Sequence, residues 1–311
     1  MGNRLKGKNA VITGAGRGIG RAVTVALAEE GANVVVCDLG CSPDGTGADR
    51  DPADAVVEEC RRLGVEATAH YGDVSDFGAA EEMINTCVHN FGKIDILCNI
   101  AGNNTWNMIF DMSEEQWDRV IAVHLKGTFN LTRHATPLMR QQRHGRIINC
   151  TSAAATRLAP LGNANYVAAK GGILSFTYAI AKEMGRYGVT CNAFAPNAKT
   201  RLWGKWSHEA AERRLAPKKL VDGLASQITD ASCFASLMAY LASDAAANVN
   251  GCAFFILGKT LGILSNPEIV RQVTIGRRRE DRWTFEEIEK RVSQELLVDY
   301  INPAPPELSN S

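Results

Sequence analysis

Tyr166 and Lys170 are the residues of this chain whose types and spacing most clearly predict chemistry. They stand four positions apart in a stretch with a helical pattern, residues 165–184, so both side chains project from one face of the expected helix. An ammonium group beside a phenol lowers the pKa of that phenol from about 10. The phenol can then donate or accept a proton near neutral pH while a hydride moves at a neighbouring carbon. The pair therefore predicts general acid/base catalysis if it lies in a binding site, and only a solvated surface pair if it does not.

The elements that must position this pair alternate between strands and helices. Short apolar runs predict buried strands, and helical patterns that end at glycine predict helices between them. Repeated alternation of this kind is typical of an α/β fold with a parallel, doubly wound sheet of the Rossmann type and helices on both faces. The expected strands are 9–14, 32–38, 65–73, 94–102, 145–152, 189–196 and 252–258.

We expect one catalytic domain followed by a C-terminal extension. The domain covers residues 1–262 and contains a turn-rich insertion at 40–52. The extension covers residues 263–311, in which Thr284 and Glu287 form a capping box ahead of apolar residues at helical spacing. We expect this helix to pack on the domain or on a neighbouring subunit.

A glycine-rich turn follows the first expected strand and opens a helix. Its sequence, TGAGRGIG (13–20), allows a tight turn and brings backbone N–H groups and the positive end of a helix dipole to a pyrophosphate. Asp38 ends the second strand, where a carboxylate accepts both hydroxyls of an adenosine ribose and repels a 2′-phosphate. Arg17 favours that phosphate, but the position of Asp38 decides for NAD over NADP. The cofactor-binding residues expected here are Gly14, Arg17, Gly18, Ile19, Gly20 and Asp38.

The ends of the third and fourth strands supply further candidates for cofactor binding. Open parallel sheets bind ligands outside the carboxyl ends of their strands. Asp73 and Val74, at the end of the third strand, are placed to contact adenine. Asn99, Ala101 and Gly102 lie at the end of the fourth.

These motifs together resemble the short-chain dehydrogenase/reductase family. The matching residues are TGAGRGIG, NIAG at 99–102 and a serine followed by YVAAK at 166–170, and the resemblance covers residues 5–260. It implies that Tyr166 is the general acid/base and that Lys170 lowers its pKa and holds the nicotinamide ribose, both lining the cofactor site. It also implies that Ser152 hydrogen-bonds the substrate oxygen. The loop implied to cover the nicotinamide amide is formed by Pro196, Asn197, Ala198 and Thr200.

The spacing between serine and tyrosine in this chain differs from that of the family. The family's serine precedes the tyrosine by thirteen positions, which here reaches Ala153, a residue that cannot hydrogen-bond a carbonyl oxygen. Counting along the strand from Gly145 reaches Ser152 instead. A strand cannot slip without turning every side chain to the other face, whereas a loop absorbs an insertion. We therefore place an extra residue in the loop 156–160 and assign Ser152, with Thr151 facing the opposite side of the strand.

His124 stands where the family has an asparagine, in the helix before the catalytic strand. That asparagine holds a water molecule in a proton relay. A histidine can hold the water through one ring nitrogen and can itself shuttle a proton. The alternative is a buried histidine whose ring nitrogens are satisfied by backbone carbonyls.

A narrower resemblance spans most of the chain, tail included. The segments DLG before the insertion, VHLKGTF, GNANY and CNAFAPNAKTR are similar to the D-3-hydroxyacyl-CoA dehydrogenase domain of peroxisomal multifunctional enzymes of type 2. This resemblance implies a NAD-dependent dehydrogenase that acts on a secondary alcohol, a 3-hydroxyacyl-CoA thioester. A hydroxysteroid or cyclic-alcohol dehydrogenase is one alternative, since this fold acts on many alcohols. A catalytically silent subunit that binds NAD is another.

A lid over the substrate is expected at residues 200–224, after the sixth strand. Trp203 and Trp206 either wall an apolar pocket or are buried within a helix. The basic residues of the segment either meet coenzyme A phosphates or form a solvated helix face. They are Lys205, Arg213, Arg214, Lys218 and Lys219.

Composition argues against several other classes of protein. The 34 basic and 34 acidic side chains balance to a net charge of +0, so no long-range field favours nucleic acid or an anionic membrane. The N-terminal residues lack the apolar core of a signal peptide and no window is long enough to span a membrane, so we expect a cytoplasmic protein. Nine scattered cysteines predict reduced thiols, and no metal site is expected. By analogy with the family we expect a homodimer or homotetramer.

Overall fold

The computed structural model of this protein describes residues 2–156, 161–198, 200–201, 230–257, 259–265, 268–274 and 283–299. The chain divides into two compact units, Met1–Leu264 and Ser265–Ser311. The first unit contains a sheet with helices on both faces, and the second contains a short helix.

The first unit is built on one sheet, to which the described part of the chain contributes eight strands. They are β1 (Asn9–Thr13), β2 (Asn33–Cys37), β3 (Ala67–His70), β4 (Ile96–Asn99), β5 (Gly145–Cys150), β6 (Val189–Asn197), β7 (Ala253–Leu257) and β8 (Thr260–Leu264). Their order is β3-β2-β1-β4-β5-β6-β7-β8, with β8 antiparallel to β7 and every other pair parallel. The order reverses between β1 and β4, so the carboxyl ends of these two strands form the topological switch point where such sheets bind ligands.

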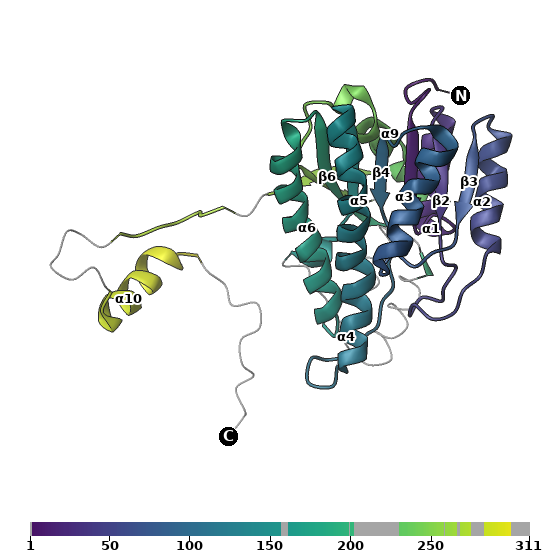
Figure 1. The fold of residues 1–311 in the computed structure, drawn as a ribbon. Coiled ribbons are helices and arrows are strands. Elements are labelled where there is room, and N and C mark those ends of the chain that lie inside the picture. Colours follow the sequence, from purple (N-terminus) through teal and green to yellow (C-terminus); the bar gives the residue numbers. More distant parts are fainter. Residues whose placement is uncertain are drawn as a thin grey trace. The chain divides into compact units, whose positions relative to one another are not determined.

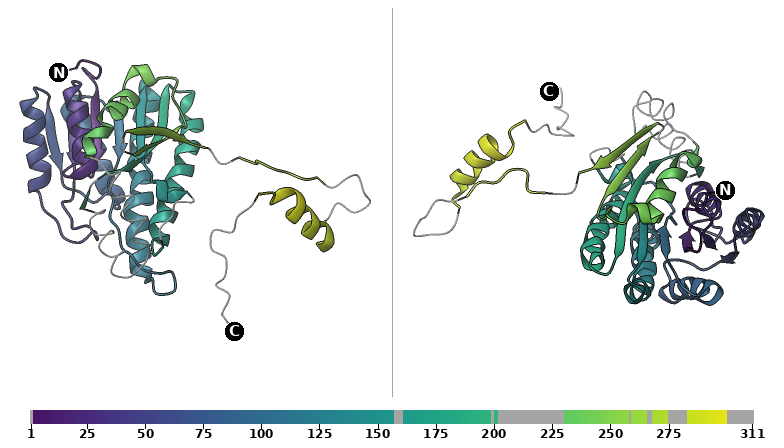
Figure 2. Two further views of the ribbon diagram at one scale, coloured as in Figure 1. Left: turned by 180° about the vertical axis from the view of Figure 1, so that it is seen from behind. Right: turned by 90° about the horizontal axis from the view of Figure 1, so that it is seen from above.

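Two hydrophobic cores lie on opposite faces of the sheet. On β1, Ile12 belongs to one core and its neighbour Val11 to the other, as the alternation of strand side chains requires. The first core is covered by α1 (Gly18–Glu29), α2 (Asp51–Arg62) and α9 (Ala235–Ala242). The second is covered by α3 (Phe77–Phe91), α5 (Gly127–Gln142), which follows the short helix α4 (Glu114–Ile121), and α6 (Ala164–Gly185). Figure 1 views the sheet from the side of α5 and α6, and the left view of Figure 2 shows the face that carries α1.

The structure confirms the predicted doubly wound α/β fold, and each of the seven expected strands is present. Two are shorter than expected, because 65–73 and 94–102 continue beyond β3 and β4 as loops at the carboxyl edge. The sequence pattern does not predict β8. It is an edge strand on which Leu261 and Ile263 are 58% and 63% exposed.

A buried hydroxyl joins the two strands at the switch point. Thr13 ends β1 and is 2% exposed. Its Oγ1 accepts hydrogen bonds from the backbone N–H groups of Ile100 (3.0 Å) and Ala101 (3.2 Å). It also donates one to the carbonyl oxygen of Cys98 at 3.4 Å. These bonds fix the turn after β4, which carries several of the predicted site residues.

The second unit contains the predicted C-terminal helix, α10 (Phe285–Arg291), which continues as a π-helical turn at Val292–Leu296. The Thr284 hydroxyl accepts a hydrogen bond from the N–H group of Glu287 at 3.3 Å, and the Glu287 carboxylate accepts one from the N–H group of Thr284 at 3.2 Å. The predicted capping box is therefore confirmed. In the described segments of both units, no helix is long and apolar enough to cross a membrane.

The role of Thr13 can be tested by removing its hydroxyl. We expect Thr13→Val to lower the free energy of unfolding by about 3 kcal/mol, because two backbone donors at the switch point lose their acceptor. Thr13→Ser keeps the hydroxyl and should lose only about 1 kcal/mol for the missing methyl group. Urea denaturation of the two variants measures the difference, and equal losses would show that the hydroxyl does not hold the turn.

Candidate active site

In the glycine turn after β1, Gly14 and Gly20 lie so close to backbone atoms that neither position has space for a side chain. At Gly14 (φ +65°), an added Cβ atom would lie 2.8 Å from the Cα atom of Ala101. At Gly20, it would overlap the carbonyl oxygen of Gly14. Helix α1 begins at Gly18, and the side chain of Arg17 in the N-cap position makes no capping hydrogen bond. The first-turn N–H groups of α1 can therefore meet phosphate oxygens.

The carboxylate of Asp38 is fixed beside this turn. Its Oδ2 accepts a hydrogen bond from the N–H group of Gly16 at 2.7 Å, and its Oδ1 accepts one from Gly40, also at 2.7 Å. An added Cβ atom on Gly16 would lie 2.9 Å from Oδ2, so glycine is needed for this approach. Each carboxylate oxygen can accept a further hydrogen bond, so Asp38 can bind ribose hydroxyls without losing its backbone contacts. The turn and its acid thus fit the adenosine and pyrophosphate parts of a dinucleotide.

At the end of the third strand, Asp73 and Val74 differ in their exposure and in their contacts. Oδ1 of the half-buried Asp73 accepts a hydrogen bond from the N–H group of Ser75 at 2.8 Å. Val74 is 8% exposed and packs on α5, where an added Cβ atom on Gly127 would lie 2.8 Å from its Cγ2. Asn130 donates to the carbonyl oxygen of Val74 at 2.9 Å. Val74 therefore anchors the strand end on α5.

The side chain of Asn99 is taken up inside the protein. It is 5% exposed, and its Nδ2 donates to Oδ1 of Asn149 on β5 (2.8 Å) and to Oγ1 of Thr132 on α5 (3.3 Å). These bonds commit the amide to the interior. The side chain of Asn99 is therefore not available for the predicted cofactor contact, and only its backbone can contact a ligand at the strand end.

Residues after β6 return to the glycine turn. Pro196 and Asn197 end β6, and Ala198 follows at 5% exposure. An added Cβ atom on Gly18 would lie 3.6 Å from Cγ2 of Thr200, in ordinary contact. The structure therefore brings the predicted loop and the glycine turn together at the carboxyl edge of the sheet.

Ser152, Tyr166 and Lys170 come together where β5 ends and α6 begins. Ser152 lies beside Tyr166, and Nζ of Lys170 lies 5.5 Å from the centroid of the Tyr166 ring. Lys170 is 2% exposed, and its Nζ donates to the carbonyl oxygen of Cys150 at 2.6 Å. The serine beside the tyrosine is thus the one that counting along the strand predicts. The hydroxyl of Thr151 turns elsewhere and donates to the carbonyl oxygen of Lys170 at 2.9 Å.

Burial sets the proton affinity of this group of side chains. It raises the pKa of Tyr166 well above its usual range; Cys150 adds to the rise, and the hydrogen bond with Ser152 opposes it. Burial also lowers the pKa of Lys170. The sequence predicts a lowered pKa for Tyr166, and for the protein alone that prediction is wrong. The loss of water around the phenol is the largest cause of this rise in pKa.

The ring of His124 packs edge-on against Tyr166, with ring centroids 5.2 Å apart and an angle of 89° between the planes. His124 is 2% exposed and lies in a π-helical turn, Ala122–Lys126, directly before α5. Its Nε2 lies 2.8 Å from the carbonyl oxygen and 3.2 Å from the backbone nitrogen of Asn103. Its Nδ1 is buried and has no hydrogen-bond partner among the described residues. One ring nitrogen is thus satisfied by backbone, and the other can hold a water molecule.

The pKa of His124 is lowered to about 3, chiefly by burial and in addition by the Lys170 ammonium, while the hydrogen bond to Asn103 opposes the shift. The imidazole is therefore neutral at physiological pH. Gly102 makes room for it, because an added Cβ atom there would overlap the imidazole ring. The glycine of the NIAG motif thus serves the histidine as well as the turn after β4.

Parts of the expected site lie outside the described residues. These are the lid from residue 202 onward, with Trp203, Trp206 and the basic residues, and positions 157–160 of the loop assigned the extra residue. Thr156, which begins that loop, donates its hydroxyl to the carbonyl oxygen of Ala153 at 2.6 Å.

Three residues that the sequence analysis does not select contribute to the site. They are Thr13, Asp49, which forms an ion pair with Arg17, and Asn103, which binds His124. Only Thr13 carries a usable sequence signal, since it is a hydroxyl residue at the end of a buried strand directly before the glycine turn. The other two act through contacts between segments far apart in the chain.

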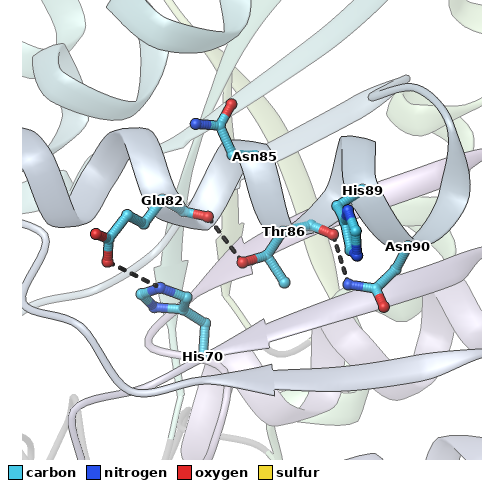
Figure 3. A pocket seen from close by; sticks show the side chains of 6 residues that line it. All are labelled: His70, Glu82, Asn85, Thr86, His89 and Asn90. Atoms are coloured by element: carbon cyan, nitrogen blue, oxygen red, sulfur yellow. Dashed lines mark hydrogen bonds and ion pairs between the residues drawn. The ribbon is translucent and has the colours of Figure 1, made fainter.

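A hollow on the surface of α3 shares no residue with this site (Figure 3). His70 at the end of β3 lies 4.0 Å from the carboxylate of Glu82. Thr86 and Asn90 donate to carbonyl oxygens of α3 itself, each at 2.7 Å.

Among the described residues, no three His, Cys, Asp or Glu side chains gather in a way that could hold a metal ion. The nine cysteines are free thiols, and six of them are buried.

The chain belongs to the short chain dehydrogenase family, whose model matches residues 8–210. This match includes the glycine turn, Ser152, Tyr166 and Lys170. With the fold and this match, the predicted membership of the family is confirmed, and with it the class of oxidoreductase.

Similar proteins extend the match along the chain. Over 276 residues the chain is 38% identical to hydroxyacyl-CoA dehydrogenase ChsB1 of Mycobacterium tuberculosis, covering 86% of this chain and 83% of that one. It is 39% identical over 252 residues to the 3-oxoacyl-(acyl-carrier-protein) reductase FabG of Staphylococcus aureus, covering 81% and 97% of the two chains. It is 40% identical over 230 residues to the peroxisomal multifunctional enzyme type 2 of Drosophila melanogaster, covering 74% of this chain and 38% of that enzyme. The predicted resemblance to the type 2 enzyme is thereby confirmed for that part of it.

A solved structure matches almost the whole length. A short chain dehydrogenase from Mycobacterium avium superposes with a TM-score of 0.76 at 35% identity, covering 98% of each chain. The arrangement of the fold is therefore shared with a member of the family.

The depressed pKa of His124 has a consequence for stability in acid. An unfolded histidine titrates near 6.5, whereas the folded protein resists protonation of His124 down to about pH 3. The unfolded chain therefore takes up a proton that the folded protein does not bind as the pH falls below 6.5. The stability contributed by this group is complete above that pH and is lost on acidification, by about 2 kcal/mol at pH 5.

Between pH 7 and pH 5, the free energy of unfolding should fall by about 2 kcal/mol less in His124→Asn than in the unchanged protein, because asparagine does not titrate. Urea denaturation at each pH measures the free energy of unfolding. His89→Asn, at an exposed position on α3, is the control and should follow the unchanged protein. If His124→Asn followed it too, His124 would not be a buried neutral imidazole.

Proposed function

We propose that this protein is a NAD-dependent dehydrogenase that interconverts a secondary alcohol and a ketone, with Tyr166 as the general acid/base. The observation that supports this most is the position of Ser152 beside Tyr166 and the buried ammonium group of Lys170. A hydroxyl, a phenol and an ammonium group in this arrangement can bind one oxygen atom and exchange its proton. Their elements meet at the same edge of the sheet as the glycine turn.

The glycine turn and Asp38 support NAD as the cofactor. Backbone N–H groups at the start of α1 suit the pyrophosphate, and the carboxylate of Asp38 suits ribose hydroxyls rather than a 2′-phosphate. When bound, NAD supplies the hydride acceptor for alcohol oxidation. Residues proposed to contact the nicotinamide half are Ala101, Gly102, Tyr166, Lys170, Pro196, Asn197, Ala198 and Thr200.

The protein's own groups divide the work on the substrate oxygen. Ser152 donates a hydrogen bond to this oxygen and holds it beside the phenol of Tyr166. Burial keeps that phenol protonated in the free protein, which is the state that gives a proton to a ketone. Oxidation of an alcohol requires the phenol to lose this proton first, and the positive charge of Lys170 favours the loss. The burial of Lys170 strengthens this influence, because little water screens it.

His124 is proposed to hold a water molecule through Nδ1, the buried ring nitrogen without a partner among the described residues. This water would be bound to the same imidazole ring that packs on Tyr166. His124 would then take the relay position of the family's asparagine, with its other nitrogen tied to Asn103.

A 3-hydroxyacyl-CoA thioester is the proposed substrate. The names of two similar proteins specify acyl chains that carry a hydroxyl or an oxo group, as hydroxyacyl-CoA and 3-oxoacyl-(acyl-carrier-protein). The match to part of the multifunctional enzyme type 2 agrees with the segments that predict such a substrate. Hydroxysteroids and cyclic alcohols are the competing substrates, and a catalytically silent NAD-binding subunit is the competing role.

We propose that residues 1–262 form the catalytic domain and that residues 263–311 form a C-terminal extension. We further propose that the protein is a cytoplasmic homodimer or homotetramer.

The assignment of the serine separates two adjacent positions. We expect Ser152→Ala to lower kcat by about 100-fold, because the substrate oxygen loses its hydrogen-bond donor in the transition state. Ala153→Ser should leave kcat nearly unchanged, since Ser152 already lies beside the tyrosine. Steady-state kinetics of the two variants make the comparison, and the opposite pattern would move the active serine to position 153.

The substrate class is tested by NADH formation with a panel of 3-hydroxyacyl-CoA thioesters, hydroxysteroids and cyclic alcohols. We expect the thioesters to give the highest kcat/KM. Tyr166→Phe should lower turnover by about 10²–10⁴-fold, since no group then exchanges the proton, while NADH still binds. Highest turnover of a steroid or cyclic alcohol would replace the thioester as substrate, and NAD binding without any turnover would indicate the silent subunit.

A further inference from the structure

The glycine turn carries a cation of the kind that binds a 2′-phosphate. Arg17 directly follows Gly16, whose N–H group binds the carboxylate of Asp38 at 2.7 Å. A guanidinium group binds phosphate through paired, charge-assisted hydrogen bonds. The glycine turn therefore carries Arg17, a cation that favours NADP, next to Asp38, an acid that disfavours it.

The structure shows this base already paired. Nη2 of Arg17 lies 3.0 Å from Oδ2 of Asp49, and its Nη1 donates to the carbonyl oxygen of Gly40 at 3.4 Å. The two charged side chains are 33% and 44% exposed, so solvent only partly screens the pair. Both partners of Arg17 come from the insertion that follows β2.

The fold of this insertion orients Asp49 before it meets Arg17. The N–H group of Asp49 donates to the carbonyl oxygen of Leu39 at 3.0 Å. Its Oδ1 accepts a hydrogen bond from the N–H group of Asp51, at the start of α2, at 3.1 Å. The two ends of the insertion touch, because an added Cβ atom on Gly40 (φ +76°) would overlap the carbonyl oxygen of Asp49. A carboxylate held in this way loses less side-chain freedom on pairing than an ordinary surface acid.

We infer that Asp49 is a specificity-determining residue that excludes NADP by keeping Arg17 in an ion pair. This inference rests on the proposed NAD dependence. To bind a 2′-phosphate, Arg17 would have to leave Asp49, and the phosphate would then face two carboxylates instead of one. Asp38 binds the ribose hydroxyls. Asp49 pairs with Arg17, the cation of the glycine turn whose positive charge could otherwise balance that of a 2′-phosphate.

The test measures binding to the full-length protein without turnover. Fluorescence titration gives dissociation constants for NADH and NADPH, and calorimetry gives those for AMP and adenosine 2′,5′-bisphosphate. Asp49→Asn should tighten the binding of NADPH and of the bisphosphate by about tenfold, because Arg17 becomes available to the phosphate. NADH and AMP should change by less than about threefold. Asp49→Ser removes the same charge and gives a second variant, and circular dichroism checks that each variant is folded.

Two further variants separate this explanation from a general charge effect. Glu59→Gln removes a carboxylate from the neighbouring ion pair, in which Arg21 lies 2.7 Å from Glu59, and should leave NADPH binding unchanged. In an Arg17→Ala background, Asp49→Asn should no longer tighten NADPH binding. The inference is wrong if Asp49→Asn gives no gain, if Glu59→Gln gives the same gain, or if the gain persists without Arg17. An unchanged protein that binds NADPH as tightly as NADH would instead contradict the proposed NAD dependence, and this is measured before any variant is made.

Discussion

The approach of backbone to backbone between β1 and β4 is the constraint on which the site depends. Gly14 leaves no space for a Cβ atom against Ala101, and the Thr13 hydroxyl binds the two N–H groups of the turn after β4. This contact sets the direction of the glycine turn and hence the start of α1. It also fixes Gly102, the next residue along that turn, so the same junction places both the glycine turn and the segment beside His124.

From this junction a series of contacts reaches Tyr166. His124 binds the backbone of Asn103 and packs on Tyr166. The insertion after β2 supports the same loop, because the N–H group of Asn104 donates to the carbonyl oxygen of Pro43 at 2.9 Å. The insertion that pairs Asp49 with Arg17 thus also braces the segment beside the histidine. One insertion therefore contacts both Arg17 of the glycine turn and Asn104 of the turn after β4.

The sequence predicts what depends on local periodicity and fails where distant segments meet. The strands follow from their apolar runs, and Ser152 follows from the register of β5, which is paired on both sides and cannot slip. The ion pair of Arg17 with Asp49 depends on how the insertion closes, which no local pattern encodes. The amide of Asn99 is absorbed by neighbours 33 and 50 positions away. The raised pKa of Tyr166 likewise reflects burial by the whole fold, whereas its four-residue spacing from a lysine reports only proximity.

The same burial limits what His124 can do in proton transfer. Two cations in one buried site would repel each other, and both desolvation and the Lys170 charge hold the imidazole neutral. Charging it near neutral pH would cost roughly 5 kcal/mol, for a pKa displaced to about 3. An imidazolium intermediate is therefore a poor carrier at this position. The ring can contribute as a neutral hydrogen-bonding group, whose water gains one proton as it gives up another. An asparagine side chain has that same capacity, so the two residue types can occupy this place in the fold without a change in the chemistry of Tyr166.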